Sequence, residues 1–235
     1  MASRMSSKPK STRLSRTTTQ PTADGLLHFF NQSPDLLCIA GFDGIFKRLN
    51  PAWSPLLGWS NTELQARPFL EFVHPDDRAA TLAVMDQLDA GAATISFENR
   101  YRCKDSSWKW LHWTASPLLD QQEIYAIARD VTRQKRLELH LYRIAQEALG
   151  NAAKHSAARH VTLLLHHGGD TLRLTVADDG HGLPPSSRDA HGMGLDSMRY
   201  RAHALGGELT LESLPDEGTV VACEIPTRPF TSSSP

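Results

Sequence analysis

The sequence predicts two α+β domains joined by one helix. Residues 35–130 carry two short strands, several short helical pieces and three longer strands, in that order. Residues 133–149 form a helical stretch without Gly or Pro. Residues 160–226 then carry a hairpin, glycine-rich turns, a second helix and a last strand. A chain of 235 residues, 40% of them hydrophobic, is long enough for two such domains.

The composition excludes several classes of partner. The formal net charge of −1 gives no electrostatic reason to expect a nucleic acid or an anionic membrane. No apolar run approaches the roughly 20 residues that span a bilayer, so we expect no membrane span and a cytoplasmic protein. The three cysteines, Cys38, Cys103 and Cys223, lie far apart without Cys-x-x-Cys spacing. We therefore expect reduced core thiols rather than a disulfide or a structural metal.

Both ends of the chain predict disordered tails. Residues 1–23 combine basic residues with many Ser and Thr, and no apolar core follows them as in a secretory signal. Residues 227–235 are rich in Ser. We assign neither tail a function.

The first domain opens with short elements. Residues 26–32 predict a helix that ends at Ser33-Pro34, and Gly41-Phe42-Asp43-Gly44 predicts a turn between two strands. The expected elements in this part are strands over 35–40 and 44–50 and helical pieces over 51–72. A further helix is expected from His74 to about residue 90, with Pro75 at its first position and carboxylates in its first turn.

Three longer strands complete this domain, over residues 93–104, 108–118 and 123–130. Their side chains alternate in character, which indicates one buried face. The residues expected on that face are Ile95, Phe97, Asn99, Tyr101, Trp108, Trp110 and His112.

Five stretches in this region give residues 24–136 a resemblance to a PAS domain. They are Asn31-Gln32-Ser33-Pro34-Asp35, Gly41 to Gly44, Leu57-Gly58-Trp59, Val73 to Asp77, and Ala128-Arg129-Asp130-Val131-Thr132. The resemblance implies an antiparallel five-stranded sheet with helices. PAS domains sense haem, flavin, small acids or nothing, so the ligand stays open. We expect none to be tightly bound, because His74 belongs to a helix start and no Cys lies in a flavin-reactive context.

A helix is expected to join the two domains. Thr132 is a candidate cap, and the helix is expected to run from residue 133 to 155 with one glycine, Gly150, which costs about 1 kcal/mol. A stripe of Leu137, Leu141, Ile144 and Ala148 suits packing against another helix or against the domains themselves. Glu147, Asn151, Lys154 and His155 share another face.

The second domain combines the parts of a nucleotide site. Strands over 160–166 and 171–178 are followed by Asp178-Asp179-Gly180-His181-Gly182, then by Gly192-Met193-Gly194-Leu195 and a helix over 195–205. Each part alone is a weak signal, since a glycine pair is most often only a turn. Their order and spacing favour the site.

Each residue type has a chemical reason to be there. An ionised Asp178 accepts a hydrogen bond from the exocyclic amine of adenine and rejects the carbonyl of guanine. Gly180 and Gly182 allow positive φ angles and close approach to a ring, while Gly192 and Gly194 precede a helix whose free amides attract a polyphosphate. Asn151 offers an amide oxygen to hydrated Mg²⁺, and Lys154 offers a charge to a phosphate.

Four motifs together give residues 141–226 a resemblance to the ATP-binding domain of sensor histidine kinases, in the subfamily paired with helix-turn-helix response regulators. Residues 147–155 match the asparagine box, 178–182 the first glycine box, 192–195 the second, and Gly218-Thr219 the closing Gly-Thr. The resemblance implies an ATP-binding α/β sandwich with Mg²⁺, and adds Leu195 and Thr219 to the nucleotide contacts. Glu147 matches the carboxylate that activates water in ATPase relatives, although in kinases it is usually not a base.

The sequence also departs from that family. None of the eleven His is followed by an acidic residue, as the phosphoacceptor of this subfamily is, and His140 is followed by Leu141. The dimerisation region and the opening strand and helix of the ATP-binding domain are missing, which predicts a shortened sandwich. Whether the chain is an enzyme therefore stays open.

We expect a cytoplasmic two-component signalling protein that resembles a sensor histidine kinase. Its expected domains are the tails, a PAS sensor over 24–136 and the ATP-binding domain over 137–226. The expected partners are a response regulator or a partner histidine kinase, and a second copy held through the PAS domain and the connecting helix. The alternative is a non-catalytic PAS and ATP-binding module that acts on a partner kinase or regulator.

Overall fold

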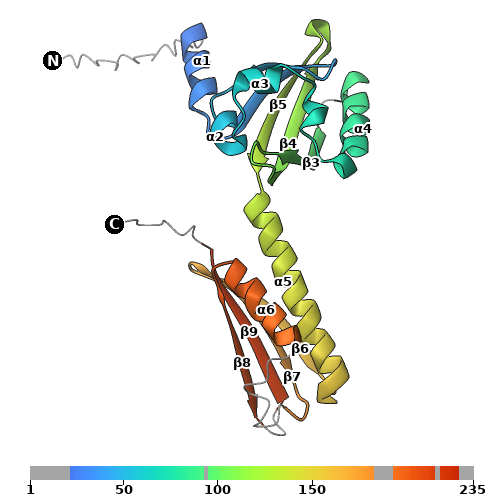
Figure 1. Cartoon of the computed structure of the whole chain (residues 1–235), viewed down its shortest axis with the longest axis vertical. Coiled ribbons are helices and arrows are strands. Elements are labelled where there is room, and N and C mark those ends of the chain that lie inside the picture. The colour runs from blue at the N-terminus through green and yellow to red at the C-terminus, as the bar shows by residue number, and fades with distance from the viewer. Residues whose placement is uncertain (1–21, 93–94, 183–192, 215–217, 228–235) are drawn as a thin grey trace, which may run out of the picture. The chain divides into compact units, whose positions relative to one another are not determined.

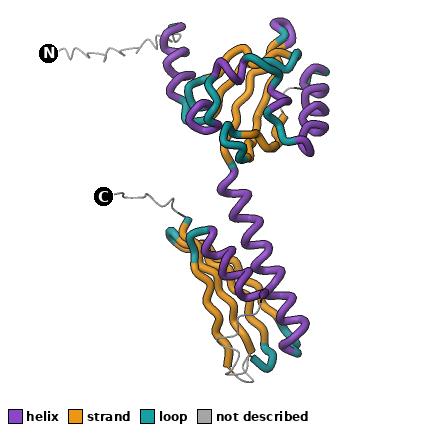
Figure 2. Tube along the Cα trace, in the orientation of Figure 1, coloured by secondary structure: helices purple, strands orange, loops and turns teal. Residues whose placement is uncertain are grey.

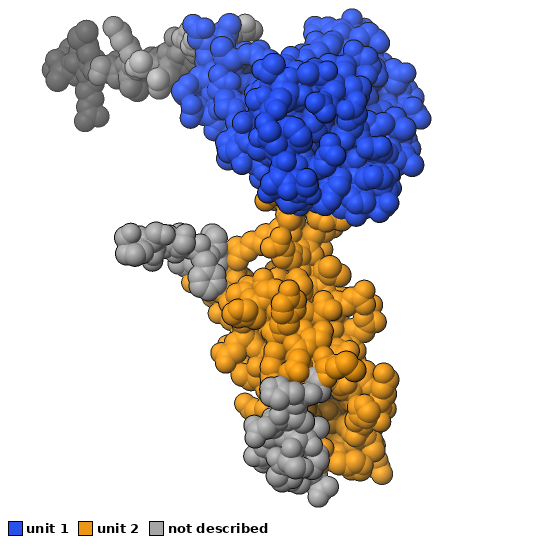
Figure 3. Space-filling model, in the orientation of Figure 1, with its two compact units in different colours: residues 1–108, 113–129 blue, residues 109–112, 130–235 orange. Residues whose placement is uncertain are grey.

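A computed structural model describes residues 22–92, 95–182, 193–214 and 218–227 of the chain (Figure 1). The chain divides into two compact units, which Figure 3 colours separately. The first unit comprises residues up to 108 and 113–129, and the second comprises residues 109–112 and those from 130 onward. Both units combine helices with a sheet, so the predicted α+β class is confirmed. The expected disordered tails lie almost wholly outside the described residues.

The first unit is built on a five-stranded sheet in the order β2-β1-β5-β4-β3, in which β1 pairs antiparallel with both β2 and β5. Its strands are β1 (Leu36–Gly41), β2 (Phe46–Leu49), β3 (Ile95–Arg102), β4 (Trp108–Leu118) and β5 (Glu123–Asp130). Its helices are α1 (Ala23–Gln32), α2 (Trp53–Leu57), α3 (Asn61–Gln65) and α4 (Arg78–Asp89), with 3₁₀ turns at Phe69–Glu71, Pro75–Asp77 and Leu119–Gln121. The predicted order of elements is confirmed.

Local sequence explains the turns and helix starts of this unit. The Gly44 amide donates to the Gly41 carbonyl at 3.1 Å, and Gly44 has a φ of 80°, which closes the predicted turn. His74 caps the 3₁₀ turn that precedes α4, because its Nδ1 accepts from the Asp76 amide at 3.2 Å. The placement of His74 at a helix start is thereby confirmed. Asp77 then pairs with Arg100 of β3 at 2.7 Å and ties α4 to the sheet.

The predicted buried face is right for β3 and wrong for β4. Asn99 and Tyr101 of β3 are buried as expected, but the buried residues of β4 are Leu111, Trp113 and Ala115. Trp108, Trp110 and His112 lie on the opposite face and are half-buried. On that face the Trp108 ring packs edge-on against His74, with 4.5 Å between the ring centroids. Aromatic residues occupy both faces of β4, so alternation alone could not identify the inner one.

The second unit is a four-stranded sheet with two helices on one face (Figure 2). The strand order is β6-β7-β9-β8, and all neighbouring strands are antiparallel. Its elements are α5 (Thr132–Asn151), a π-helical turn (Ala152–Ser156), β6 (Val161–Gly168), β7 (Thr171–Asp178), α6 (Met193–Ala204), β8 (Glu208–Leu214) and β9 (Gly218–Pro226). The predicted strands and helices are confirmed, with ends shifted by one or two residues, except that regular helix α5 ends at Asn151, four residues before the predicted end, and continues as the π-helical turn.

The predicted apolar stripe of α5 packs into the core of this unit. Ile144 and Ala148 of α5 are buried in one cluster with residues of β7, α6 and β9, and Leu137 and Leu141 pack against it. The stripe therefore packs against its own unit. Thr132 does not cap α5 as predicted; it is the first residue of the helix, and its amide donates to the Asp130 carboxylate at 2.8 Å. Among the described residues, no helix is long and apolar enough to cross a membrane.

Candidate functional site

The second unit contains a cavity of about 340 Å³ between the end of α5, the start of α6 and the sheet. This volume lies within the range of small-molecule sites, about 300–1,000 Å³. The residues that line it are Glu147, Ala148, Asn151, Ala152, His155, Ser156, Asp178, Gly182, Gly194, Leu195, Leu211, Thr219 and Val221. Most of the residues that the sequence predicted for a nucleotide site are therefore brought together.

The helix α5 supplies one wall of the cavity through Glu147 and Asn151, which are one turn apart. Asn151 is the last residue of the regular helix, and its side chain makes no capping hydrogen bond to the turn that follows. After it the chain widens into the π-helical turn, where the Ser156 hydroxyl donates to the Ala152 carbonyl at 2.8 Å. Ala157 ends the turn with a φ of 50°. Single π turns are frequent at functional sites.

The sheet supplies the opposite wall through Asp178 and Thr219. Asp178 is the last residue of β7 and lies directly opposite Thr219 of β9, so both side chains share one face. The Thr219 hydroxyl lies 3.2 Å from that of Ser213 on β8. One carboxylate oxygen of Asp178 accepts from the Gly180 amide at 3.0 Å, and the described residues place no donor on the other. That oxygen is available to a ligand.

Glycines shape the cavity in two ways. Gly182 and Gly218 have φ angles of 70° and 84°, which favour glycine. Gly180 and Gly194 have ordinary φ angles, so the predicted positive φ at Gly180 is wrong. Both lie in close contacts: a Cβ on Gly180 would collide with the backbone carbonyl of Ser156, and one on Gly194 would require the Glu147 carboxylate to move.

Asp179 fixes the neighbouring loop, a role that sequence reasoning missed. One of its carboxylate oxygens accepts from the amides of Arg159 and His160 at 2.8 and 2.9 Å, and the other lies 2.9 Å from the His160 ring. Hydrogen bonds from His160, first from its backbone and then from its ring, lower the pKa of Asp179 to about 2. An Asp that follows a strand end and precedes a glycine was the available signal, since such residues bond to nearby amides.

Two of the predicted residues that the structure describes do not line the cavity. Lys154 lies on the π-helical turn with an exposed side chain, and Gly180 lies against the backbone of Ser156. Gly192 lies outside the described residues. Conversely, Ser156, Leu211 and Val221 line the cavity and were not predicted. Nothing in a strand pattern marks which apolar residue faces a ligand, and Ser156 lies on a π-helical turn that has no sequence signature.

His140 lies on α5 and is not among the residues that line the cavity. Its Nδ1 is buried and has no hydrogen-bond partner among the described residues. Burial lowers the pKa of His140, and the charges of Arg201 and Arg136 lower it further.

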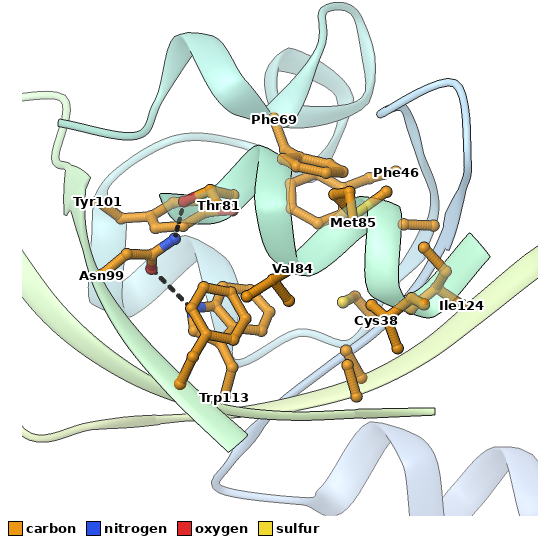
Figure 4. Close-up of a pocket in the computed structure, with 15 residues that line it drawn as sticks. Cys38, Phe46, Phe69, Thr81, Val84, Met85, Asn99, Tyr101, Trp113 and Ile124 are labelled. Atoms are coloured by element: carbon orange, nitrogen blue, oxygen red, sulfur yellow. Dashed lines mark hydrogen bonds between the residues drawn. The ribbon is translucent and has the colours of Figure 1, made fainter. Parts of the chain in front are cut away.

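The first unit encloses a much smaller cavity of about 40 Å³ between α4 and the sheet (Figure 4). Its lining is mostly apolar, with one polar chain at its side. The Trp113 indole donates to Asn99 at 2.8 Å, and the Asn99 amide donates to Thr81 at 3.1 Å, as the dashed lines in Figure 4 show. These polar groups satisfy one another. The cavity is also far below the usual size of a ligand site, at least about 300 Å³.

Comparisons with known proteins agree with this division of the chain. Residues 136–229 match the family described as histidine kinase-, DNA gyrase B-, and HSP90-like ATPase. Residues 46–127 match the PAS fold family. The chain therefore has a PAS fold followed by a histidine kinase-type ATPase domain.

Similar proteins include two curated bacterial kinases. The sensor histidine kinase LiaS of Bacillus subtilis is 39% identical over 101 residues, which are 43% of this chain and 28% of LiaS. The signal transduction histidine-protein kinase/phosphatase UhpB of Salmonella typhimurium is 44% identical over 88 residues, 37% of this chain and 17% of UhpB. The matches thus span less than a third of these relatives. Among solved structures, the blue-light activated histidine kinase EL346 of Erythrobacter litoralis is 18% identical, with a TM-score of 0.35 over 85% of this chain and 97% of that one.

Proposed function

We propose that the second unit binds ATP with Mg²⁺ and that the chain acts as a cytoplasmic, sensor histidine kinase-like protein of a two-component system. The observation that carries the proposal is the convergence of Glu147, Asn151, Asp178, Gly194 and Thr219 on one cavity of ligand size. These residues come from two helices and two strands that are far apart in the sequence. A common ligand explains why they meet.

Asp178 supports adenine as the base. Its free carboxylate oxygen is a hydrogen-bond acceptor and suits an exocyclic amine, whereas the carbonyl of guanine in that place would be repelled. Gly182 and Ser156 also line the cavity, and their backbone lies close to the end of the cavity that Asp178 occupies. We infer that the adenine ring lies at this end, against β7 and the π-helical turn.

The phosphates fit the helix ends. The first turn of α6, with Gly194 and Leu195 in the cavity lining, presents backbone amides that attract anions. Lys154 is exposed close in sequence to Asn151 and offers a flexible charge. The described residues contain no cluster of three His, Cys, Asp or Glu side chains that could hold a metal. Mg²⁺, which keeps most of its waters, needs only an oxygen such as that of Asn151 besides the phosphates, and would neutralise their charge.

The partners follow from the domain combination: a response regulator or a partner histidine kinase, and a second copy of this chain. Because Ile144 and Ala148 are buried in their own unit, a dimer contact along α5 has to use its exposed apolar residues. Exposed apolar residues are present on α5 and in the first unit, namely Leu139, Tyr142, Leu149, Leu26, Phe29, Tyr125 and Ile127. These surfaces are where we place the PAS and connecting-helix contacts.

The second candidate is a non-catalytic module that binds ATP and acts on a partner kinase or regulator. His140 favours it, because this residue lies outside the cavity lining and precedes Asn151 by eleven positions on α5. That separation is about 16 Å along the helix axis. Phosphoryl transfer depends on close positioning of the nucleophile, which His140 of the same chain does not provide. Glu147 would then help to shape the site rather than act as a base.

Calorimetry with Mg-ATP tests the proposal. We expect binding that ADP competes with and that Asp178→Asn weakens about tenfold or more, because it replaces a charged acceptor. Asp86→Asn, on the exposed surface of the first unit, is the matched control and should leave the affinity unchanged. The absence of heat and of ADP competition at millimolar nucleotide would show that the cavity is not an ATP site.

A further inference from the structure

The strand β6 leaves an unusual surface at the edge of the second unit. It comprises eight residues, Val161–Gly168, and all of them are exposed. Leu163, Leu164 and Leu165 at its centre are 47%, 57% and 54% exposed. Three consecutive leucines with half their surface in water are costly, because each side chain gains about 1.5–3 kcal/mol on full burial. This stretch has the character of an interface.

Nothing in β6 blocks the pairing of a further strand. Among the described strands β6 pairs only with β7, so its other side presents unpaired amides and carbonyls. Exposed edges are normally protected by charged side chains, Pro or β-bulges. Residues 161–168 contain no Lys, Arg, Asp, Glu or Pro, and their register with β7 runs without a bulge.

A strand added at this edge would also extend the core. Leu163 and Leu165 lie opposite Val176 and Leu174 of β7, which are buried beneath the helices. Their side chains therefore belong to the helix-covered face and continue its apolar row to the edge. Leu164 lies opposite Thr175 on the other face.

We propose that β6 is an interface between two copies of this chain, in addition to the PAS and connecting-helix contacts, and that the two strands pair antiparallel about a two-fold axis at Leu164. In this register Leu164 lies opposite its own copy, and Leu163 lies opposite Leu165 of the other chain on the helix-covered face. The two four-stranded sheets then form one continuous sheet across the dimer. Leu163 and Leu165 then pack against each other across the interface on the helix-covered face, Leu164 packs against its own copy on the other face, and every residue from 161 to 167 finds a partner.

The charged residues on the other edge strands favour a second copy of β6 as the partner strand. The opposite edge of the same sheet, β8, carries Glu208 and Glu212, so pairing it with β6 would place carboxylates beside a row of leucines. The edge strands of the first unit, β2 and β3, carry Lys47 and Arg48, and Glu98, Arg100 and Arg102. Of the four edge strands in the part of the chain that the structure describes, only β6 is both apolar and uncharged. A β6–β6 contact also closes after two copies, whereas a β6–β8 contact would grow into a filament.

Oxidative cross-linking tests the register. In the paired strands the two Cα atoms at position 164 are about 4.5–5.5 Å apart, a separation that a disulfide spans. We expect Leu164→Cys to give a disulfide-linked dimer under mild oxidation, because Cys38, Cys103 and Cys223 are buried. Leu82→Cys, at an exposed position of α4 in the first unit, is the matched control and should stay monomeric on the same gel. The absence of a cross-link at position 164 would overturn the proposal.

Hydrogen exchange as a function of protein concentration tests the interface without a cysteine. We expect the amides of β6 to gain protection as concentration rises, and Leu164→Lys to abolish that gain by placing two positive charges face to face. The control Leu82→Lys should retain the gain of protection with concentration. Protection that does not depend on concentration would mean that the edge is covered within one chain, and protection only on addition of another protein would mean a different occupant. Either result rejects the proposal. All these measurements omit nucleotide, so their outcome is separate from that of ATP binding.

Discussion

Gly194, in the first turn of α6, lies so close to Glu147 of α5 that a Cβ at position 194 would collide with the Glu147 carboxylate. The two helices thus meet at the cavity through a glycine and a carboxylate. The contact places the free amides of α6 beside the residues of α5 that face the cavity. Any side chain at position 194 has to displace either Glu147 or the ligand.

The first prediction is that Gly194→Ala weakens Mg-ATP binding with little loss of stability. The Glu147 carboxylate is the end of a flexible side chain and can move, and alanine is favoured over glycine in a helix by up to about 1 kcal/mol. We expect a loss of affinity of about tenfold, equivalent to about 1.4 kcal/mol, in calorimetry. Gly25→Ala in α1 of the first unit is a control that should not change the affinity. Unchanged affinity for Gly194→Ala would contradict the placement of the phosphates at α6.

The second prediction compares two glycines of the second unit. A Cβ on Gly150 meets no atom within 4 Å, so Gly150→Ala should raise the free energy of unfolding by about 0.5–1 kcal/mol. A Cβ on Gly180 would collide with the backbone carbonyl of Ser156, so Gly180→Ala should lower it by about 1–3 kcal/mol. Denaturant unfolding followed by circular dichroism measures both. Equal effects of the two substitutions would show that the close approach at Gly180 is not required.

The third prediction concerns acid stability. The hydrogen bonds from His160 and Arg159 lower the pKa of Asp179 from 3.8 to about 2. A lowered pKa means that the folded state favours the ionised carboxylate, so its stabilising effect is complete above the unfolded pKa and is lost as pH falls toward 2. Asp179→Asn should therefore melt below wild type at pH 6, and the two melting curves should converge near pH 2. A difference that stays constant with pH would show that the charge of Asp179 does not act this way.

The fourth prediction is that the chain alone does not phosphorylate itself. Transfer needs a nucleophilic nitrogen about 3–3.5 Å from the phosphorus atom, and His140 is about 16 Å along α5 from Asn151. Leu141, the next residue, cannot serve as a base. Incubation with γ-labelled ATP should leave no acid-labile label. Label that appears on wild type and disappears in His140→Gln would mean that one copy phosphorylates another.

The fifth prediction is that the purified protein carries no stoichiometric haem or flavin. The cavity of the first unit measures about 40 Å³, and Asn99, Thr81 and Trp113 satisfy one another beside it. A ring cofactor would need the core to be rebuilt. Absorption spectra after gel filtration test this expectation directly. A Soret band or a retained flavin spectrum would reject it.

The sequence predicted the bounds of the strands better than it predicted which face of a strand is buried. The strands β4 and β5 begin and end where expected, because polar turns such as Asp105-Ser106-Ser107 and Asp120-Gln121-Gln122 bound clear apolar runs. The inner face of β4 was misjudged, since Trp108 and Trp110 are as apolar as Leu111 and Trp113. Only the packing of α4 against one side of the sheet distinguishes them.

The sequence predicted the site residues whose side chains carry a group that suits a nucleotide. It did not predict the residues that reach the site only through the local geometry of the backbone. Asp178 and Asn151 carry groups that suit a nucleotide, and both line the cavity. The π-helical turn at Ala152–Ser156 has no sequence signature, so the position of Ser156 in the lining and the exposure of Lys154 could not be foreseen. The need for glycine at Gly180 was foreseen, but its cause is a carbonyl from another segment rather than an unusual φ angle.

The burial of Ile144 and Ala148 also limits where this chain can be joined to another sensor domain in a chimeric protein. The helix that carries them begins at Thr132, directly after the last strand of the first unit, and is an inner wall of the second. A chimera that replaces the sensor with another one must therefore be spliced upstream of Leu137. A junction further along α5 would exchange core side chains together with the sensor, and the recipient domain would lose part of its own interior.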